Sequence, residues 1–363
     1  MSKLPRVIFG PEIWSLQNEG GISRYFQELI HGLSNLGVGG KVLAQIQTNQ
    51  RLGALEVEGF EIQSHANPIE SYKEVIKQLG EGVHVDIFHP TYYSKDHLRF
   101  REPKTKVVVT VFDMISELFP ERKPLFRKVV DEKRISVHKA DHILTISTQT
   151  KKDLMNIYGV PAEKISVTYL GSKLHLLQQE DLSTVAQDRF ILYVGKRGGY
   201  KNFINFITAY SHSKSLSSGF SIVAVGGGKF TPNENSNLQK LGIIDKVKQV
   251  DADDLELSTY YRKAACLVYP SLYEGFGLPP VEAMSLNCPV IASNGGSIPE
   301  ICKAAAEYFD PADIDSIEHV LSTALEDEQR LRQMRQTGLE VAEMFTWEKT
   351  ALATLDAYKR IIA

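Results

Sequence analysis

Short runs of apolar, largely β-branched residues alternate with helix-length amphipathic segments along almost the whole chain. Strands that are apolar on both faces need cover on both faces, which predicts an α/β fold built on parallel sheets. The expected strands are Val7–Gly10, Lys41–Ala44, Ile87–His89, Lys106–Phe112, His142–Ile146, Ile165–Tyr169, Phe190–Val194, Ser221–Val225, Val247–Val250, Cys266–Tyr269, Val290–Ala292 and Tyr308–Phe309.

The alternation occurs twice, and the chain of 363 residues is long enough for two cores. The polar stretch 178–187 carries no strand pattern, and we place the linker there. The prediction is a Rossmann-like domain over 1–175 and a second over 176–345, facing each other across a cleft. Ligands of such sheets bind at the carboxyl ends of the strands.

Composition excludes several classes of protein. The net charge of −3 gives no basic footprint for nucleic acid. The cysteines Cys266, Cys288 and Cys302 lack metal-ligand spacing, and we interpret them as reduced thiols. No secretory signal is evident, and the longest apolar runs are too short to span a bilayer. We therefore expect a cytoplasmic protein.

The most informative segment is the loop that follows the strand Cys266–Tyr269. Glu274, Gly275, Phe276 and Gly277 precede two prolines and a helix. Proline is tolerated in the first helical turn, and the free amides of a helix N-terminus attract anions. Glutamates 274 and 282 flank this loop, and a carboxylate accepts hydrogen bonds from vicinal hydroxyls. For Glu282, simple stabilisation by the helix dipole is an equally weighted alternative.

These residues resemble the E-x7-E signature of retaining glycosyltransferase family 4, which has the GT-B fold. Other pieces of the chain resemble the family in the same order. They are Gly20–Arg24 (GGISR), Val108–Asp113 (VVTVFD), Ile146–Lys152 (ISTQTKK), Tyr193–Asn202 (YVGKRGGYKN), Ser293–Glu300 (SNGGSIPE) and Phe345–Trp347 (FTW).

The resemblance implies roles in donor binding. Glu282 would bind the ribose, and Glu274 the transferred sugar. The backbone around Glu274 would assist through Gly275, Phe276, Gly277 and Leu278. Lys201 and Arg197 would clamp the diphosphate, with Lys196 as the alternative second cation. Cations placed there stabilise the charge that builds on the leaving phosphate.

Base contacts are expected from the turn at Gly226 and from the segment that begins at Val250. Asp251 and Asp253 form a D-x-D pattern, which binds a metal in other glycosyltransferases. Here the pattern precedes a helix, and N-capping is the better interpretation. We expect no metal and no other cofactor.

In the first half, Gly20 and Gly21 would form a loop near the diphosphate and the acceptor, or a plain helix-entry turn. His89 and Tyr92 follow a strand and would face the cleft to contact acceptor or sugar, unless they are packed. Asp113 would orient a substrate. The family often has histidine where this chain has Phe112, which would offer an apolar wall.

Two further segments carry alternatives. The basic, apolar stretch 121–134 would rest on an anionic membrane or be a solvated helix with a buried stripe. One long helical pattern covers 316–344. The final segment, 346–363, is expected to cross back onto the first domain, although packing on its own domain is the simpler alternative.

The prediction is a retaining hexosyltransferase of polysaccharide biosynthesis, working in the cytoplasm or at the inner face of the membrane. The donor would be a nucleotide-sugar, with UDP-glucose narrowly ahead of GDP-mannose. The acceptor would be a saccharide or a lipid-linked saccharide. The rival interpretation is a non-catalytic nucleotide-sugar-binding or scaffold subunit, motivated by Phe112.

Overall fold

The computed structural model describes residues 4–17, 20–45, 57–65, 70, 72–73, 77, 84–95, 104–120, 124–174 and 189–363. The chain forms two compact units, one of Met1–Leu170 with Trp347–Ala363 and one of Gly171–Thr346. The division therefore falls after residue 170, where the sequence predicted 175. The expected linker at 178–187 lies outside the described residues.

The first unit contains a seven-stranded parallel sheet with the order β3-β2-β1-β4-β5-β6-β7. Its strands are β1 (Arg6–Phe9), β2 (Gly39–Gln45), β3 (Phe60–His65), β4 (Ile87–His89), β5 (Lys106–Val111), β6 (His142–Thr145) and β7 (Ile165–Val167). The described helices are α1 (Glu12–Leu16), α2 (Gly21–Asn35), α4 (Ile115–Leu118), α5 (Pro124–Lys139), α6 (Thr148–Tyr158) and α15 (Trp347–Ile362).

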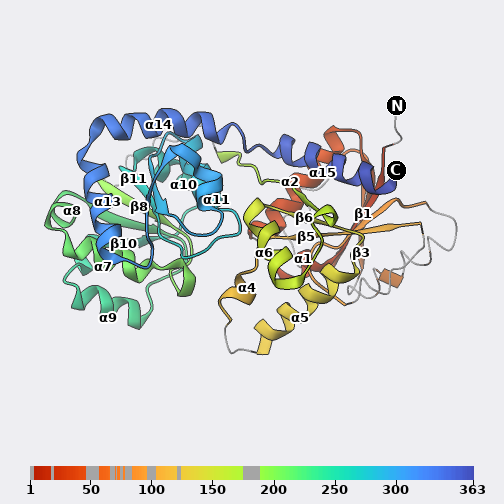
Figure 1. Ribbon diagram of the computed structural model, residues 1–363, viewed down its shortest axis with the longest axis horizontal. Coiled ribbons are helices and arrows are strands. Elements are labelled where there is room, and N and C mark those ends of the chain that lie inside the picture. The colour runs from red at the N-terminus through yellow and green to blue at the C-terminus, as the bar shows by residue number, and fades with distance from the viewer. Residues whose placement is uncertain are drawn as a thin grey trace. The chain divides into compact units, whose positions relative to one another are not determined.

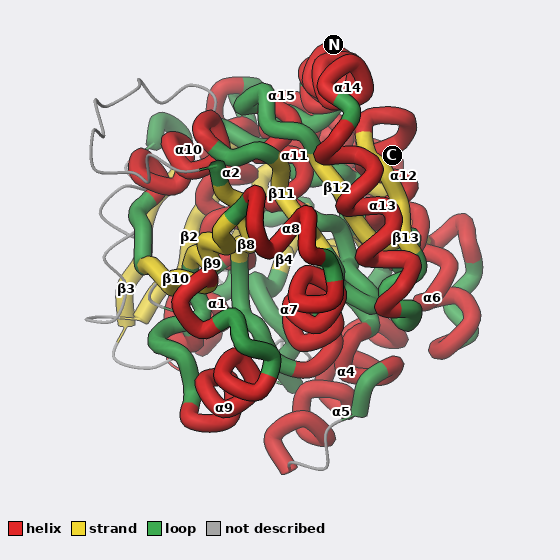
Figure 2. The backbone as a smooth tube through the Cα atoms, turned by 90° about the vertical axis from the view of Figure 1, so that its left-hand side faces the viewer, coloured by secondary structure: helices red, strands yellow, loops and turns green. Residues whose placement is uncertain are grey.

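The second unit contains a six-stranded parallel sheet with the order β10-β9-β8-β11-β12-β13. Its strands are β8 (Phe190–Val194), β9 (Ser221–Val225), β10 (Val247–Val250), β11 (Cys266–Tyr269), β12 (Val290–Ser293) and β13 (Ala306–Phe309). Figure 2 shows β11, β12 and β13 side by side. The helices are α7 (Phe203–His212), α8 (Lys214–Gly219), α9 (Pro232–Lys240), α10 (Asp254–Lys263), α11 (Leu278–Ser285), α12 (Ile298–Cys302), α13 (Ile314–Glu326) and α14 (Glu328–Ala342).

The central strands are buried on both faces, which is why they read as continuous apolar runs. The three cysteines are free and buried. Among the described residues, no helix is both long and apolar enough to cross a membrane.

Two elements differ from the sequence prediction. Strand β3 was not predicted, because its polar and apolar residues are interspersed and it lies at the sheet edge. The segment 316–344 is helical, as its period predicts, but it is divided into two helices, α13 and α14. The carboxylate of Asp327 accepts a hydrogen bond from the Arg330 amide at 3.0 Å and starts the second helix as its N-cap.

Helix α15 belongs to the first unit and lies beside α2 (Figure 1). A Cβ atom at Gly32 of α2 would come within 2.6 Å of the Ala351 side chain, so glycine permits a close approach of the two helices. The Thr350 hydroxyl donates to the Tyr169 carbonyl at 2.6 Å. Leu355 and Tyr358 are buried, whereas Leu352 is 48% exposed.

Candidate active site

The candidate site lies where the strand order of the second unit reverses. β8 and β11 are neighbours in the sheet although β9 and β10 separate them in sequence. The chain leaves β8 toward one edge and β11 toward the other, and such a reversal opens a crevice at the carboxyl ends of the two strands. The loops that follow β8 and β11 carry Lys201 and Glu274.

The side chains of Lys201 and Glu274 form an ion pair. The Lys201 Nζ donates to the Glu274 Oε1 at 2.7 Å, with side chains 19% and 9% exposed. The ammonium group also lies 5.8 Å from the centre of the Tyr269 ring. Burial and the neighbouring Glu274 raise the pKa of Tyr269 well above its usual value. A cation and a carboxylate thus meet in a partly desolvated place, where their attraction is stronger than in water.

The two loops are tied together by Asn202 and Leu272. Asn202 adopts a left-handed conformation, with φ of 58°, and is buried. Its side-chain Nδ2 donates to the carbonyls of Pro270 at 3.1 Å and Pro311 at 2.7 Å. The Leu272 amide donates to the Tyr200 carbonyl at 2.8 Å. These bonds fix the backbone on either side of Lys201.

The loop bearing Glu274 is braced from behind by residues 295–297. The Ser297 hydroxyl, which is buried, bonds to the carbonyls of Glu274 at 2.9 Å and Phe276 at 2.8 Å. Gly296 has a φ of 59°, and a Cβ atom there would lie 2.7 Å from the Glu274 amide nitrogen. The segment Ser293–Glu300, which resembles the family, therefore acts as a support for the signature loop.

Glu282 lies on α11, which starts after Gly277 and has proline in its first turn. Its carboxylate accepts a hydrogen bond from the Tyr261 hydroxyl at 2.9 Å, and Glu282 is 5% exposed. Burial and this carboxylate raise the pKa of Tyr261. The predicted backbone contacts at Gly275, Phe276, Gly277 and Leu278 lie between the two glutamates, and the Phe276 ring packs against Phe345.

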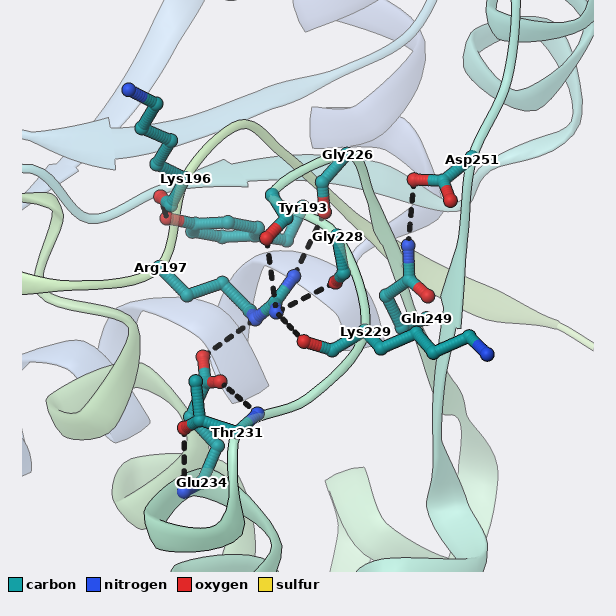
Figure 3. Close-up of polar contacts among 11 residues, drawn as sticks. Tyr193, Lys196, Arg197, Gly226, Gly228, Lys229, Thr231, Glu234, Gln249 and Asp251 are labelled. Carbon is teal, nitrogen blue, oxygen red and sulfur yellow. Dashed lines mark hydrogen bonds and ion pairs between the residues drawn. The ribbon is translucent and has the colours of Figure 1, made fainter.

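Arg197 is directed into the protein (Figure 3). Its guanidinium donates to the carbonyls of Gly226 and Gly228, each at 2.8 Å, and its Nε donates to Glu234 at 2.7 Å. The side chain is only 3% exposed. These contacts engage the guanidinium, so Arg197 is not presented as an open phosphate ligand in this structure.

Lys196 differs from Arg197 in the exposure and the direction of its side chain. Its side chain is exposed and points away from Arg197 (Figure 3). Lys196 and Arg197 both line a cavity of about 520 Å³, together with Gly198, Gly199 and residues of α7 and α9. Of the two cations considered for the second position of the clamp, Lys196 is the accessible one.

The carboxyl ends of β9 and β10 lie next to each other, since the Gly226 amide donates to the Val250 carbonyl at 2.9 Å. Asp253 caps α10, and its carboxylate accepts from the Glu256 amide at 2.9 Å while Glu256 bonds back to the Asp253 amide. The prediction that Asp253 is an N-cap is confirmed. Asp251 accepts instead from the Gln249 side chain at 2.9 Å.

Among the described residues, no group of three or more His, Cys, Asp or Glu side chains is placed to hold a metal ion.

In the first unit, Gly20 and Gly21 begin α2. The Arg24 amide closes the first helical turn on the Gly20 carbonyl at 3.0 Å. A Cβ atom at Gly21 would meet nothing within 4 Å, and its φ is not in the left-handed region. Neither backbone conformation nor crowding within the chain requires glycine at this position.

His89 is a core residue, and its predicted contact with acceptor or sugar is not supported. Its side chain is 0% exposed, and its ring nitrogens bond to the Tyr358 hydroxyl at 2.6 Å and the Thr110 hydroxyl at 2.9 Å. Burial lowers the pKa of His89 to about 3. The strand-end position was right, but α15 supplies Tyr358 and covers it.

Phe112 is also packed in the core of the first unit, where it makes an edge-to-face contact with Tyr25 at 5.1 Å. Asp113 accepts from the Ile115 amide at 2.9 Å at the start of α4. Tyr92 is partly buried beside Tyr93, and burial raises its pKa to about 12. The apolar side chain of Phe112 therefore faces the core of the first unit.

Lys133, in the basic stretch 121–134, belongs to the protein interior and not to the exposed face of α5. It is 2% exposed, and its Nζ bonds to the Glu117 carboxylate at 2.8 Å and the Asp113 carbonyl at 3.0 Å. Tyr158 donates to the same glutamate. Lys133 thus braces the loop that carries Asp113. Residues 121–123 lie outside the described residues.

Comparison with known proteins identifies the family. A model of the group 1 glycosyl transferases matches residues 177–341, and a model of glycosyltransferase family 4 matches residues 19–174. The chain is 30% identical over 295 residues to the O-antigen chain mannosyltransferase B of Escherichia coli, covering 75% of this chain and 74% of that protein. The chain is a family 4 glycosyltransferase.

Two other relatives are mannosyltransferases by name. The O-antigen chain mannosyltransferase RfbU of Salmonella typhimurium is 32% identical over 56% of this chain and 57% of its own length. The MMP alpha-(1->4)-mannosyltransferase of Mycolicibacterium hassiacum is 30% identical over 67% of this chain and 60% of its own. The matches thus span less than two thirds of these two proteins.

Solved structures share the fold of this glycosyltransferase. Sucrose-phosphate synthase from Thermosynechococcus elongatus superposes with a TM-score of 0.76 at 18% identity, covering 99% of both chains. Anabaena HepE, in complex with UDP and glucose, gives 0.76 at 15% identity over 98% of this chain and 99% of that chain. With its two parallel-sheet units, the chain has the GT-B fold.

Sequence reasoning missed residues that fix the loops at the strand-order reversals of this glycosyltransferase. Asn202 was quoted only as the end of a motif, and the residues 295–297 only as a resemblance. Glu12, at the carboxyl end of β1, was not considered. Its buried carboxylate accepts from the Thr91 amide at 2.9 Å, and burial raises its pKa. The sequence did offer signals for two of these features. Asn202 stands directly before a helix, and the paired glycines Gly295 and Gly296 follow a strand, as is typical of tight loops.

Proposed function

We propose that this glycosyltransferase moves a hexose, with retention of anomeric configuration, from a nucleotide-sugar to a saccharide or lipid-linked acceptor in polysaccharide biosynthesis. The observation that carries the proposal is the 2.7 Å contact between Lys201 and Glu274 where the strand order reverses. We expect the reaction in the cytoplasm or at the inner face of the membrane, because the relatives include enzymes named for O-antigen chains.

In this proposal Lys201 stabilises the charge that develops on the leaving diphosphate. The bond from the anomeric carbon to the phosphate oxygen breaks, and a bond to the acceptor oxygen forms on the same face. The leaving phosphate oxygen takes the proton of the acceptor hydroxyl. Glu274 contacts the sugar, Glu282 holds the ribose hydroxyls, and no metal is required.

The names of the relatives favour mannose as the transferred sugar, carried on GDP, over the UDP-glucose that sequence reasoning put narrowly first. A panel of UDP-glucose, UDP-galactose and GDP-mannose would decide, with donor hydrolysis as the readout. We expect GDP-mannose to be hydrolysed fastest, with unchanged rate in excess chelator. Loss of activity with chelator would overturn the metal-independent part.

A non-catalytic nucleotide-sugar-binding subunit is the second candidate, because Phe112 stands where the family often has histidine and is packed against Tyr25. The two candidates differ in turnover. Binding of a nucleotide-sugar with no hydrolysis, and no transfer to oligosaccharide or lipid-linked acceptors, would favour the binding subunit. Proton NMR of the product would show the anomeric configuration and test retention.

A further inference from the structure

The turn that follows β9 has an unusual backbone. Gly226, Gly227 and Gly228 have φ values of 81°, 74° and 72°, all in the left-handed region. Cβ atoms at the first and third positions would meet nothing within 4 Å, so backbone conformation rather than crowding requires glycine there. Three such residues in a row leave the free turn many alternative conformations, and something must select one.

Arg197 selects it. The planar guanidinium donates to Gly226, Gly228 and, at 3.3 Å, Lys229, so that successive carbonyls converge on one group (Figure 3). A Cβ atom at Gly227 would lie 2.8 Å from the guanidinium, which closes the remaining space. The Phe230 ring lies 4.7 Å from the guanidinium carbon.

Glu234 holds Arg197 from the other side. Its Oε1 accepts from the Arg197 Nε at 2.7 Å, and its Oε2 accepts from the Thr231 amide at 2.7 Å (Figure 3). Thr231 in turn caps α9 through the Glu234 amide. The guanidinium is therefore fixed to the first turn of a helix. A carboxylate and several carbonyls thus already occupy most of the N–H donors of the guanidinium.

The direction of the carbonyls sets the direction of the amides. In a planar trans peptide the C=O of one residue points opposite to the N–H of the next. Since the carbonyls of Gly226 and Gly228 point at Arg197, the amides of Gly227 and Lys229 point away from it. Within the described part of the chain, no hydrogen-bond acceptor is found for these two N–H groups.

We propose that Arg197 is a positioning residue that orients these amides toward acceptor atoms of the nucleoside part of the donor. The turn lies at the carboxyl end of β9, beside β8, whose loop carries Lys201. The diphosphate is then left to Lys201 and the exposed Lys196. This assignment rests on the proposed function and refines it, because it moves Arg197 from direct phosphate contact to the shaping of the nucleoside site.

The number of phosphates on the ligand separates the two roles. The affinities of guanosine, GMP and GDP, and of uridine, UMP and UDP, are measured for the wild type and for Arg197→Lys. Lysine keeps the charge but cannot reach the glycine carbonyls and Glu234 together. We expect a loss of about tenfold, the equivalent of one charge-assisted hydrogen bond, that is the same for nucleoside, monophosphate and diphosphate.

Lys196→Met is the matched comparison on the same loop. Its loss of affinity should grow with the number of phosphates and be absent for the nucleoside. A loss in Arg197→Lys that is confined to phosphorylated ligands would overturn the assignment, and so would an unchanged affinity for every ligand. Glu234→Gln keeps Arg197 and removes the charge of its anchor, and should give a smaller loss that is likewise independent of phosphate.

Thermal unfolding of each variant identifies failures to fold, and if Arg197→Lys does not fold, Glu234→Gln decides the question by the same pattern. Binding of neither ligand series by the wild type would overturn the proposed function itself, and this assignment with it. A normal wild type with a phosphate-dependent loss in Arg197→Lys would overturn the assignment alone.

Discussion

Both units reverse their strand order once, and at each reversal a buried glutamate bridges the two loops. In the first unit Glu12, after β1, accepts hydrogen bonds from Thr91, after β4, and from Tyr72. In the second unit Glu274, after β11, accepts from Lys201, after β8. The glutamate follows the earlier strand of the reversal in the first unit and the later strand in the second, and its partners are neutral in one unit and charged in the other.

Under the proposed function, this difference separates a reversal that binds substrate from one that does not. Glu12 is buried and its hydrogen-bond donors are neutral, so its carboxylate serves to link the loops after β1 and β4. Lys201 is 19% exposed, and in the function we propose a phosphate oxygen replaces Glu274 as the partner of its ammonium group. The first reversal therefore contributes stability, whereas the second contributes an exchangeable charge. Each of the following predictions tests this division.

The largest effect is expected for Lys201→Ala. Without the ammonium, the charge on the leaving diphosphate is uncompensated, and kcat should fall about 10²- to 10³-fold. Lys246→Ala, which removes an exposed lysine of the same unit, is the control. Steady-state transfer assays measure both. Near-normal activity of the Lys201 variant would contradict an active role for the second reversal.

The next effect concerns stability in acid. His89 has an ordinary pKa of 6.5 and a pKa of about 3 in the folded chain, because burial disfavours the charged ring. Between these two pKa values, the His89 ring therefore binds a proton in the unfolded chain but not in the folded chain. The free energy of unfolding is not reduced by His89 above pH 6.5. It falls as the pH drops toward 3, and the loss due to His89 is about 2 kcal/mol at pH 5.

Urea unfolding of the wild type and of His89→Gln from pH 7.5 to 4 tests this, followed by hydrogen exchange in β4 and α15. The difference between the two curves isolates His89 from other titrating groups, among them His142, whose pKa burial lowers to about 4. Parallel curves would mean that His89 is not enclosed as described.

A smaller effect separates the two glutamates of the second unit. Glu282→Gln should weaken nucleoside diphosphate binding about tenfold, since the ribose hydroxyls lose a charged acceptor. Its side-chain oxygen can still accept from Tyr261, which preserves the fold. Glu274→Gln should change this affinity less than about twofold while lowering turnover. Calorimetry with GDP and UDP decides, and the opposite pattern would show that the roles are exchanged.

The smallest effect on the fold is expected at Gly21. Alanine there meets no neighbour, so the free energy of unfolding should change by less than about 1 kcal/mol. If the backbone of Gly20 and Gly21 lies near substrate, transfer nevertheless falls. The contrast is Gly296→Ala, which places a Cβ atom against the Glu274 amide and should lower both stability and activity. Full transfer by Gly21→Ala would reduce this segment to a helix-entry turn.

The sequence predicted the parallel strands well because they are buried on both faces. Ile87–His89, Phe190–Val194, Ser221–Val225 and Cys266–Tyr269 match the structure in both bounds. Strand β3 was not predicted because it lies at the edge of the sheet, where its residues need not be apolar. The break at Asp327 was hidden because the apolar period continues through it.

The strand-end argument located the edge of each sheet but not what covers it. His89 lies at such an edge and is covered by Tyr358, a residue far along the chain that no local pattern relates to it. Arg197 shows the same limit. A basic residue in a glycine-rich loop predicted a phosphate contact, but the carbonyls that engage its guanidinium come from the turn after the next strand.

The position of α15 has a consequence for synthesis of the protein. The last strand of the first unit ends at Val167, but the helix that packs on α2 and supplies Tyr358 starts at Trp347. At about 5–20 residues per second, a ribosome needs on the order of ten to forty seconds to make the intervening chain. Throughout that interval the nascent first unit lacks its covering helix and is a natural client for chaperones. Only translation past Tyr358 completes it, and a chain that stops earlier leaves His89 without its partner from α15.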